Sequence, residues 1–155
     1  KLYRGGFPPY YKINRRKCMK RDLGDTINSF LSIAPQTVGA GSTESTVNGT
    51  GADRLGYESA VFVFGNCQPL GTPLGVTVTC KVQDSSDNIT YTDVTGASST
   101  HNVTNTYTET EIAVDLKPQA RYVRGVVTVQ FNGGTGPYVI VDAHGILGSA
   151  KTYPV

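Results

Sequence analysis

The sequence contains two histidines, His101 and His144, and these are the first candidates for acid–base chemistry. Nucleophilic catalysis would require one of them beside an activated serine or cysteine. The segment Gly56-Tyr57-Glu58-Ser59-Ala60 approaches a nucleophile elbow but lacks its second glycine. We therefore expect no catalytic residues. His144 is predicted to be a partly buried strand residue and His101 an exposed loop residue.

Three aspartates, Asp84, Asp87 and Asp93, could suggest calcium, which prefers carboxylate oxygens. A calcium loop, however, places alternate ligands at tight spacing and closes with a bidentate carboxylate, and this segment does not. The glycine-rich residues 133–137 lie between two predicted strands, whereas a phosphate-binding loop precedes a helix. We expect both segments to be turns, with no metal and no cofactor.

The cysteines Cys18, Cys67 and Cys80 are odd in number and include no closely spaced pair. This argues against a disulfide framework and against a zinc site of the Cys-x-x-Cys type. We expect free thiols, with Cys80 acting as a small core hydrophobe in an alternating strand.

Positive charge is concentrated at the start of the sequence. Eight of the 14 Lys and Arg residues and one of the 12 Asp and Glu residues precede position 23, which leaves six basic and eleven acidic residues after it. The Pro8-Pro9 pair disfavours a helix here. We expect residues 1–22 to form an extended arm that binds a partner, the capsid or a neighbouring subunit, through Tyr3, Arg4, Phe7, Tyr10, Tyr11, Arg15, Arg16 and Lys17.

Two kinds of partner suit such an arm. Its cations and aromatic rings could contact nucleic acid by phosphate pairing and base stacking. The acidic remainder of the chain would repel a phosphate backbone, so the pattern favours a tether that lies on an acidic protein surface.

Residues 23–155 are predicted to form one β-domain. The alternation is clearest in residues 74–83, followed by a turn at Asp84–Asn88 and a returning strand over 89–94. Residues 23–36 are predicted as an irregular strand or short helical turn ended by Pro35, and 37–56 as a loop or weak edge strand. Further strands are predicted at 57–64, 101–107, 109–116, 121–131 and 138–147. This count indicates an all-β antiparallel sandwich, either jelly-roll or immunoglobulin-like. No apolar run approaches the roughly 18 residues that a membrane span needs.

From Met19 onward the sequence resembles a family of small structural proteins encoded in the head-gene regions of tailed bacteriophages. The resemblance depends on the order of several short motifs: Met19-Lys20-Arg21-Asp22-Leu23, Ser32-Ile33-Ala34-Pro35, Asn48–Asp53, Gly56–Ala60, Val82–Val94, Arg121-Tyr122-Val123-Arg124 and Leu147-Gly148. Asn88 and Tyr91 stand where the family pattern has Gly and Trp. The resemblance implies a β-sandwich virion protein, a decoration (cement) protein on the capsid surface, made in the cytoplasm of the host bacterium.

The residues before Met19 have no counterpart in the family pattern. Arg15-Arg16-Lys17 can be encoded as a ribosome-binding sequence just upstream of the Met19 codon, so residues 1–18 are either a true extension or upstream sequence translated from the wrong start. An intact mass of the purified protein distinguishes the two.

These observations predict a non-enzymatic virion protein that binds the major capsid protein. We expect it to form a homo-oligomer, a trimer or another symmetric cluster, because symmetry multiplies small contacts into avidity. Two alternatives stay open: a capsid or head–tail protein whose arm contacts the packaged nucleic acid, and a carbohydrate-binding sandwich on a surface. We expect no membrane partner.

Overall fold

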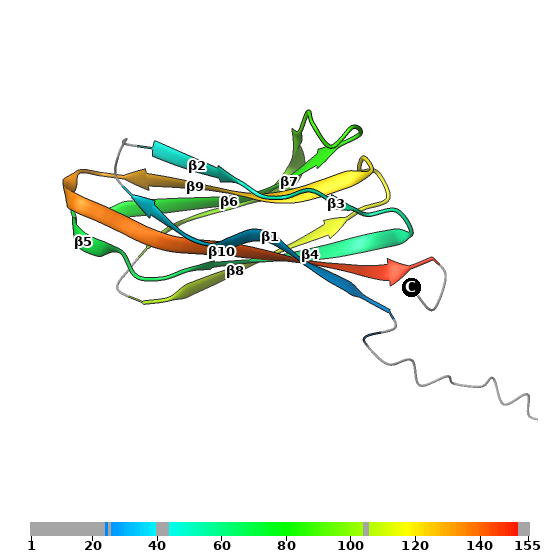
Figure 1. Cartoon of the computed structure of the whole chain (residues 1–155), viewed down its shortest axis with the longest axis horizontal. Coiled ribbons are helices and arrows are strands. Elements are labelled where there is room, and N and C mark those ends of the chain that lie inside the picture. The colour runs from blue at the N-terminus through cyan, green and yellow to red at the C-terminus, as the bar shows by residue number, and fades with distance from the viewer. Residues whose placement is uncertain (1–23, 25, 40–43, 104–105, 152–155) are drawn as a thin grey trace, which may run out of the picture.

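The computed structural model describes residues 24, 26–39, 44–103 and 106–151, and these residues form two antiparallel sheets packed face to face (Figure 1). The predicted arm, residues 1–22, lies outside the described residues. The strands are β1 (Asn28–Gly39), β2 (Glu44–Asn48), β3 (Ala52–Asp53), β4 (Tyr57–Asn66), β5 (Leu70–Pro73), β6 (Val76–Ser85), β7 (Thr92–Asn102), β8 (Thr108–Asp115), β9 (Tyr122–Phe131) and β10 (Gly134–Ala150).

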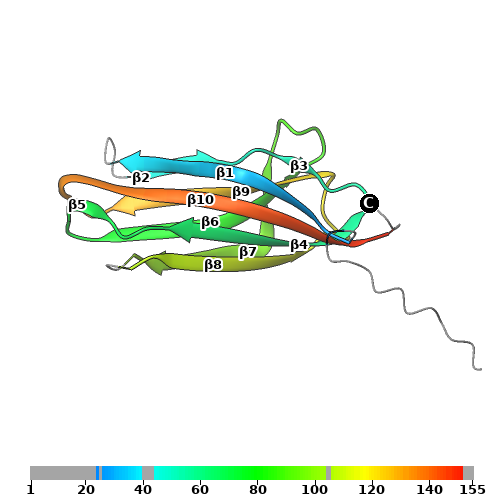
Figure 2. The same ribbon diagram turned by 60° about the horizontal axis from the view of Figure 1, so that its bottom comes forward.

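The strand order identifies the sandwich as a jelly roll, one of the two topologies that the sequence allowed. Sheet A has the order β1-β10-β4-β8 and sheet B the order β2-β9-β6-β7, with β5 added to β10 and β3 to β9. The main strands therefore pair in nested fashion: β1 with β10, β2 with β9, β4 with β8 and β6 with β7. This is the pattern of a long hairpin rolled into two sheets. Figure 2 shows the two layers from a second direction.

The core fills the space between the sheets with aliphatic and aromatic side chains. Phe62 and Phe64 on β4 are fully or almost fully buried, and Phe30 packs edge-on against Phe62 at 5.8 Å between ring centroids. Cys80 is also buried, as predicted, and burial raises the pKa of its thiol to about 12. The inward positions of β8, Ile112 and Val114, are buried as the alternation predicts.

One side of the sandwich is closed by a hydrogen-bonded junction around Ser32. A register irregularity in β1 places this buried serine opposite sheet B. Its hydroxyl accepts a hydrogen bond from the Gly125 amide at 2.9 Å, and its carbonyl accepts one from the Thr50 amide at 2.7 Å. The Gly49 amide donates to the Gly125 carbonyl at 2.9 Å. The junction thus joins β1 of one sheet to β9 and the end of β2 in the other.

The opposite side is bridged by His101 on β7 and Asn66 on β4, with 3.0 Å between His101 Nε2 and Asn66 Oδ1. Burial lowers the pKa of His101, which favours the neutral imidazole. His144 lies in a strand, β10, as predicted, but its side chain is 55% exposed rather than partly buried. The prediction for His101 was wrong, because this residue is half-buried in β7 and does not lie in an exposed loop. His101 is half-buried because β7 extends through residue 101 and the imidazole contacts Asn66 of the other sheet.

Several element boundaries also differ from prediction. Pro35 does not end its strand, because β1 is an edge strand with a register irregularity between Ile33 and Gln36, where a missing amide proton is tolerated. The predicted strands at 89–94 and 101–107 are replaced by the single strand β7 over 92–102. The glycine-rich segment is a turn only at its start, since β10 begins at Gly134 and pairs with β5.

Nowhere in the described part of the chain is there a helix with the length and apolar character needed to cross a bilayer.

Candidate interaction surface

The three aspartates that could have suggested calcium have separate hydrogen-bonding roles. Asp84 accepts from the Ala120 amide at 2.7 Å, whereas Asp93 pairs with Lys81 at 2.9 Å. Asp87 instead organises the turn between β6 and β7. Among the described residues, no group of three or more His, Cys, Asp or Glu side chains could hold a metal ion.

The turn between β6 and β7 projects from the sandwich (Figure 1). Asp87 Oδ1 accepts hydrogen bonds from the amides of Thr90 at 2.8 Å and Ile89 at 2.9 Å, and from the Ser85 hydroxyl at 2.8 Å. Asn88 adopts the left-handed conformation, with φ of 61°. These contacts present Ile89, 83% exposed, at the tip of the turn.

Hydrogen bonds lower the pKa of the Asp87 carboxyl from 3.8 to about 2, and the bond from the Thr90 amide has the largest effect. A lowered pKa means that the carboxylate stabilises the fold fully above pH 3.8 and that this stabilisation is lost as the pH falls toward 2. We therefore expect Asp87→Asn to lose stability at neutral pH and to show a smaller drop in melting temperature between pH 4 and pH 2. Thermal unfolding followed by circular dichroism measures both effects. Glu111→Gln, which removes an exposed carboxylate elsewhere, is the matched control; an unchanged acid profile for Asp87→Asn contradicts the assignment.

The outer face of sheet B is polar, and its side chains pair with one another. A row of threonines crosses all four main strands, with hydroxyl contacts of 3.0 Å between Thr46 and Thr128 and 2.9 Å between Thr79 and Thr100. The Arg124 guanidinium donates to Gln83 and lies 3.9 Å from the centroid of the Tyr91 ring. This face therefore satisfies most of its polar groups within the chain.

The outer face of sheet A has a different character. Residues directly opposite each other in antiparallel strands share a face, so the strand registers define its rows. One row contains Leu31 and Val63 with His144 between them, and the next contains Ile146, Val61 and Ala113. The rows, from β1 to β8, are Leu31-His144-Val63-Glu111 and Ser29-Ile146-Val61-Ala113, flanked by Asp142-Gly65-Glu109 and Gly148-Ser59-Asp115. We call these residues, together with Ile140, the sheet A face.

Apolar side chains of the sheet A face are accessible to solvent. Leu31 is 46% exposed and Ile140 38% exposed, and Val61, Val63 and Ile146 are half-buried. Strands whose two faces are both apolar are normally covered on both sides. An exposed apolar strip of this kind is therefore a candidate interaction surface.

Gly65 shapes one end of this face. A Cβ atom at this position would lie 2.5 Å from Asp142 Oδ1 and 2.7 Å from the Tyr107 hydroxyl, so both polar groups lie directly over the glycine. Burial, together with the charges of Asp142 and Glu109, raises the pKa of Tyr107 and keeps its phenol protonated. Tyr107 therefore adds an exposed aromatic ring and a hydroxyl donor beside the acidic residues.

The charges of the sheet A face are acidic and largely unpaired. The five described strands of sheet A contain no lysine or arginine. Glu109, Glu111 and Asp115 are exposed on β8 and form no ion pair within the described ranges. Asp142 lies 3.7 Å from His144 Nε2. A field of one sign around an apolar strip suits a basic partner with apolar or aromatic groups.

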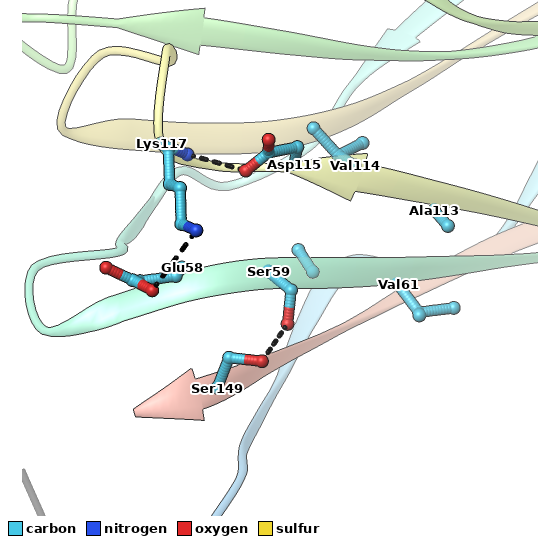
Figure 3. Close-up of a pocket in the computed structure, with 9 residues that line it drawn as sticks. Glu58, Ser59, Val61, Ala113, Val114, Asp115, Lys117 and Ser149 are labelled. Atoms are coloured by element: carbon cyan, nitrogen blue, oxygen red, sulfur yellow. Dashed lines mark hydrogen bonds and ion pairs between the residues drawn. The ribbon is translucent and has the colours of Figure 1, made fainter. Parts of the chain in front are cut away.

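A shallow concavity lies at the other end of the face, where Val61 and Ala113 are neighbours on β4 and β8 (Figure 3). The Ser59 hydroxyl donates to that of Ser149 at 3.0 Å. Glu58 lies 3.7 Å from both Lys117 and Lys151, so the lysines at this end are paired. The hollow is open, and the hydroxyl and charged groups that line it contact one another or a neighbouring lysine.

The sequence-predicted site residues Tyr3, Arg4, Phe7, Tyr10, Tyr11, Arg15, Arg16 and Lys17 lie outside the described residues. The sheet A face was not predicted. Its signal was present in the unbroken apolar run Ala60–Phe64, which lacks the polar alternate positions of a half-exposed strand. The acidic residues at alternate positions of β8, Glu109 and Glu111, point the same way.

No protein-family model and no curated protein matches the chain. Among solved structures the chain is similar to TmCBM61, in complex with β-1,4-galactotriose, at 16% identity and a TM-score of 0.41, over 78% of this chain and 69% of that one. It is also similar to a protein of the disulfide-linked pili of Bacillus endospore appendages, at 18% identity and a TM-score of 0.38, over 81% and 90%. Similarity to the enzymatically active domain of bacteriophage CBA120 tailspike protein 4 is 11% identity at a TM-score of 0.36, over 77% of this chain and 19% of that one. These similarities assign no ligand and no function to this chain.

Proposed function

We propose that the chain is a non-enzymatic structural protein of a tailed-phage virion, a decoration protein that binds the major capsid lattice on the capsid surface. We further propose that the sheet A face is its protein-binding surface in the particle. The observation that carries this proposal is the exposed apolar strip of the sheet A face, edged by unpaired carboxylates. The sequence resemblance supports the phage setting.

The geometry of the face favours a protein partner. The strip runs across four adjacent strands, from Leu31 on β1 to Ala113 on β8, and its concavity is open. Stable protein interfaces are broad, with an apolar centre and a polar rim, whereas small-molecule sites enclose their ligand. Repetition of such a contact over a symmetric lattice supplies avidity that one copy lacks.

The test uses particles of the encoding phage from which this gene has been deleted. We expect the purified full chain to co-sediment with these particles and to saturate at a fixed ratio to the major capsid protein. Binding that never saturates, or protein that stays in the supernatant at every concentration, overturns the proposal. Naked genomic DNA serves as the matched control, because binding to it with steep salt dependence indicates a nucleic-acid role for the arm instead.

A carbohydrate-binding role is the second candidate, favoured by two exposed tyrosines: Tyr107, 61% exposed, lies beside the carboxylate of Asp142, and Tyr138 on β10 is 37% exposed. Amphipathic rings beside polar groups suit the faces of sugar rings. Saturable binding to a glycan array by the full chain, together with no binding to deletion particles, would favour this candidate over the first.

A further inference from the structure

The sheet A face has a charge complement within the same sequence. We propose that the sheet A face of one copy binds the basic N-terminal segment, residues 1–22, of a second copy. This inference rests on the proposed function, because it names the occupant of the same face.

Charge is the first argument for this pairing. The segment has eight basic residues and one acidic residue, whereas the five strands of sheet A have no lysine or arginine. Glu109 and Glu111 are exposed on an edge strand, and neither has an ion-pair partner in the part of the chain that the structure describes. Opposite fields of this kind steer association and fix its register.

Apolar chemistry is the second argument. The segment contains four aromatic residues, Tyr3, Phe7, Tyr10 and Tyr11, spaced among its cations. The sheet A face offers an exposed apolar strip of matching kind, centred on Val61, Val63 and Ile146. Aromatic and arginine side chains commonly dominate the binding energy where an apolar strip is covered.

Chain direction is the reason to assign the segment to a second copy. β1 begins at Asn28 opposite Leu147 and runs from that end along sheet A, so the segment joins the described chain at that end of the sheet. A return onto the face of the same copy would require the chain to reverse direction. Extended, 22 residues span at most about 75 Å, whereas a ten-residue strand is about 33 Å long, so a neighbouring copy is well within reach.

The contact is heterologous, since the segment of one copy meets the face of the next. Such contacts close into rings when the rotation between copies permits it. Each copy supplies one segment and one face, so a closed ring leaves neither unoccupied. The exchange therefore provides a route to the symmetric cluster expected from the sequence.

The first experiment measures self-association of the full chain by sedimentation velocity. We expect assembly at low salt and dissociation at about 1 M salt, where the screening length is about 3 Å. Glu109→Gln/Glu111→Gln and Arg15→Gln/Arg16→Gln should each raise the dissociation constant about tenfold. The control Glu44→Gln/Asp93→Asn, which removes two carboxylates from sheet B and with them the Lys81–Asp93 ion pair, should leave it unchanged. The charge exchange Glu109→Arg/Glu111→Arg with Arg15→Glu/Arg16→Glu should restore assembly.

The second experiment separates exchange between copies from docking within one copy. Heavy-isotope-labelled and unlabelled full chains are mixed, and a carbodiimide couples lysine amines to nearby carboxylates without a spacer. We expect mixed-isotope cross-links between Lys12, Lys17 or Lys20 and Glu109 or Glu111. Three results would each overturn the proposal. They are cross-links confined to one isotope, a chain that is monomeric at every salt concentration, and an intact mass showing that the purified protein begins at Met19. If the protein still binds particles in any of these cases, the exchange between copies is wrong, whereas the proposed decoration function is retained.

Discussion

Gly49→Ala is expected to lower the free energy of unfolding by about 2–4 kcal/mol, because the added methyl group would clash with the junction that joins the two sheets. A Cβ atom at this position would lie 2.6 Å from the Gly125 carbonyl oxygen and 2.9 Å from that of Ser32, and would also meet the Ser32 hydroxyl. Two of these neighbours are backbone atoms held by hydrogen bonds, so they cannot move aside without breaking the junction. Relief of the clash would separate β1 from β9 and leave the buried Gly125 amide without an acceptor.

Urea unfolding measured by far-ultraviolet circular dichroism or tyrosine fluorescence tests this expectation, since the chain contains no tryptophan. Gly39→Ala is the matched control: its Cβ would meet Tyr138 Cβ at 3.9 Å, an ordinary contact, and the change should stay within about 0.5 kcal/mol. Equal stabilities for the two variants would mean that the junction around Ser32 does not hold the sheets together.

Local alternation predicted the strands whose two faces differ most. In β6, inward Val76, Val78 and Cys80 alternate with threonines; the predicted inward face is confirmed, and the strand lies two residues later than the predicted 74–83. β7 was divided wrongly because its Ser and Thr residues face solvent on an edge strand, where burial imposes only a weak period of two. The strand predictions were therefore accurate where one face of a strand is buried and poor on a solvent-exposed edge strand.

The jelly-roll order was beyond local reasoning, because it depends on pairings between residues far apart in sequence. β1 pairs with β10 more than 100 positions later, through Asn28 and Leu147. Ser32 shows the consequence: nothing in its sequence context marks it as a buried link to Gly125. The sheet A face depends on the same order, since Leu31 and Val63 fall on one row only because both pair with His144 of β10, which lies between their strands.

Leu31→Glu is expected to weaken binding to deletion particles at least about tenfold, with little effect on folding. Leu31 is 46% exposed on the edge strand β1, so its replacement removes little core packing and should cost less than about 1 kcal/mol of stability. On the sheet A face, however, it is an apolar member of the row that continues through His144 and Val63. A carboxylate there places a charge in the apolar strip and strengthens an already acidic field, and a buried unpaired charge is costly in any interface.

The matched control is Leu74→Glu, because Leu74 is 85% exposed between β5 and β6, away from the sheet A face. Binding curves for both variants and the unaltered chain, measured by co-sedimentation after circular dichroism shows equal folding, isolate the contribution of the face. A weakened Leu31→Glu beside an unaffected Leu74→Glu assigns particle binding to the sheet A face. Equal binding by all three proteins would place the particle contact elsewhere. The projecting β6–β7 turn, with Ile89 at its tip, would then be the next surface to substitute.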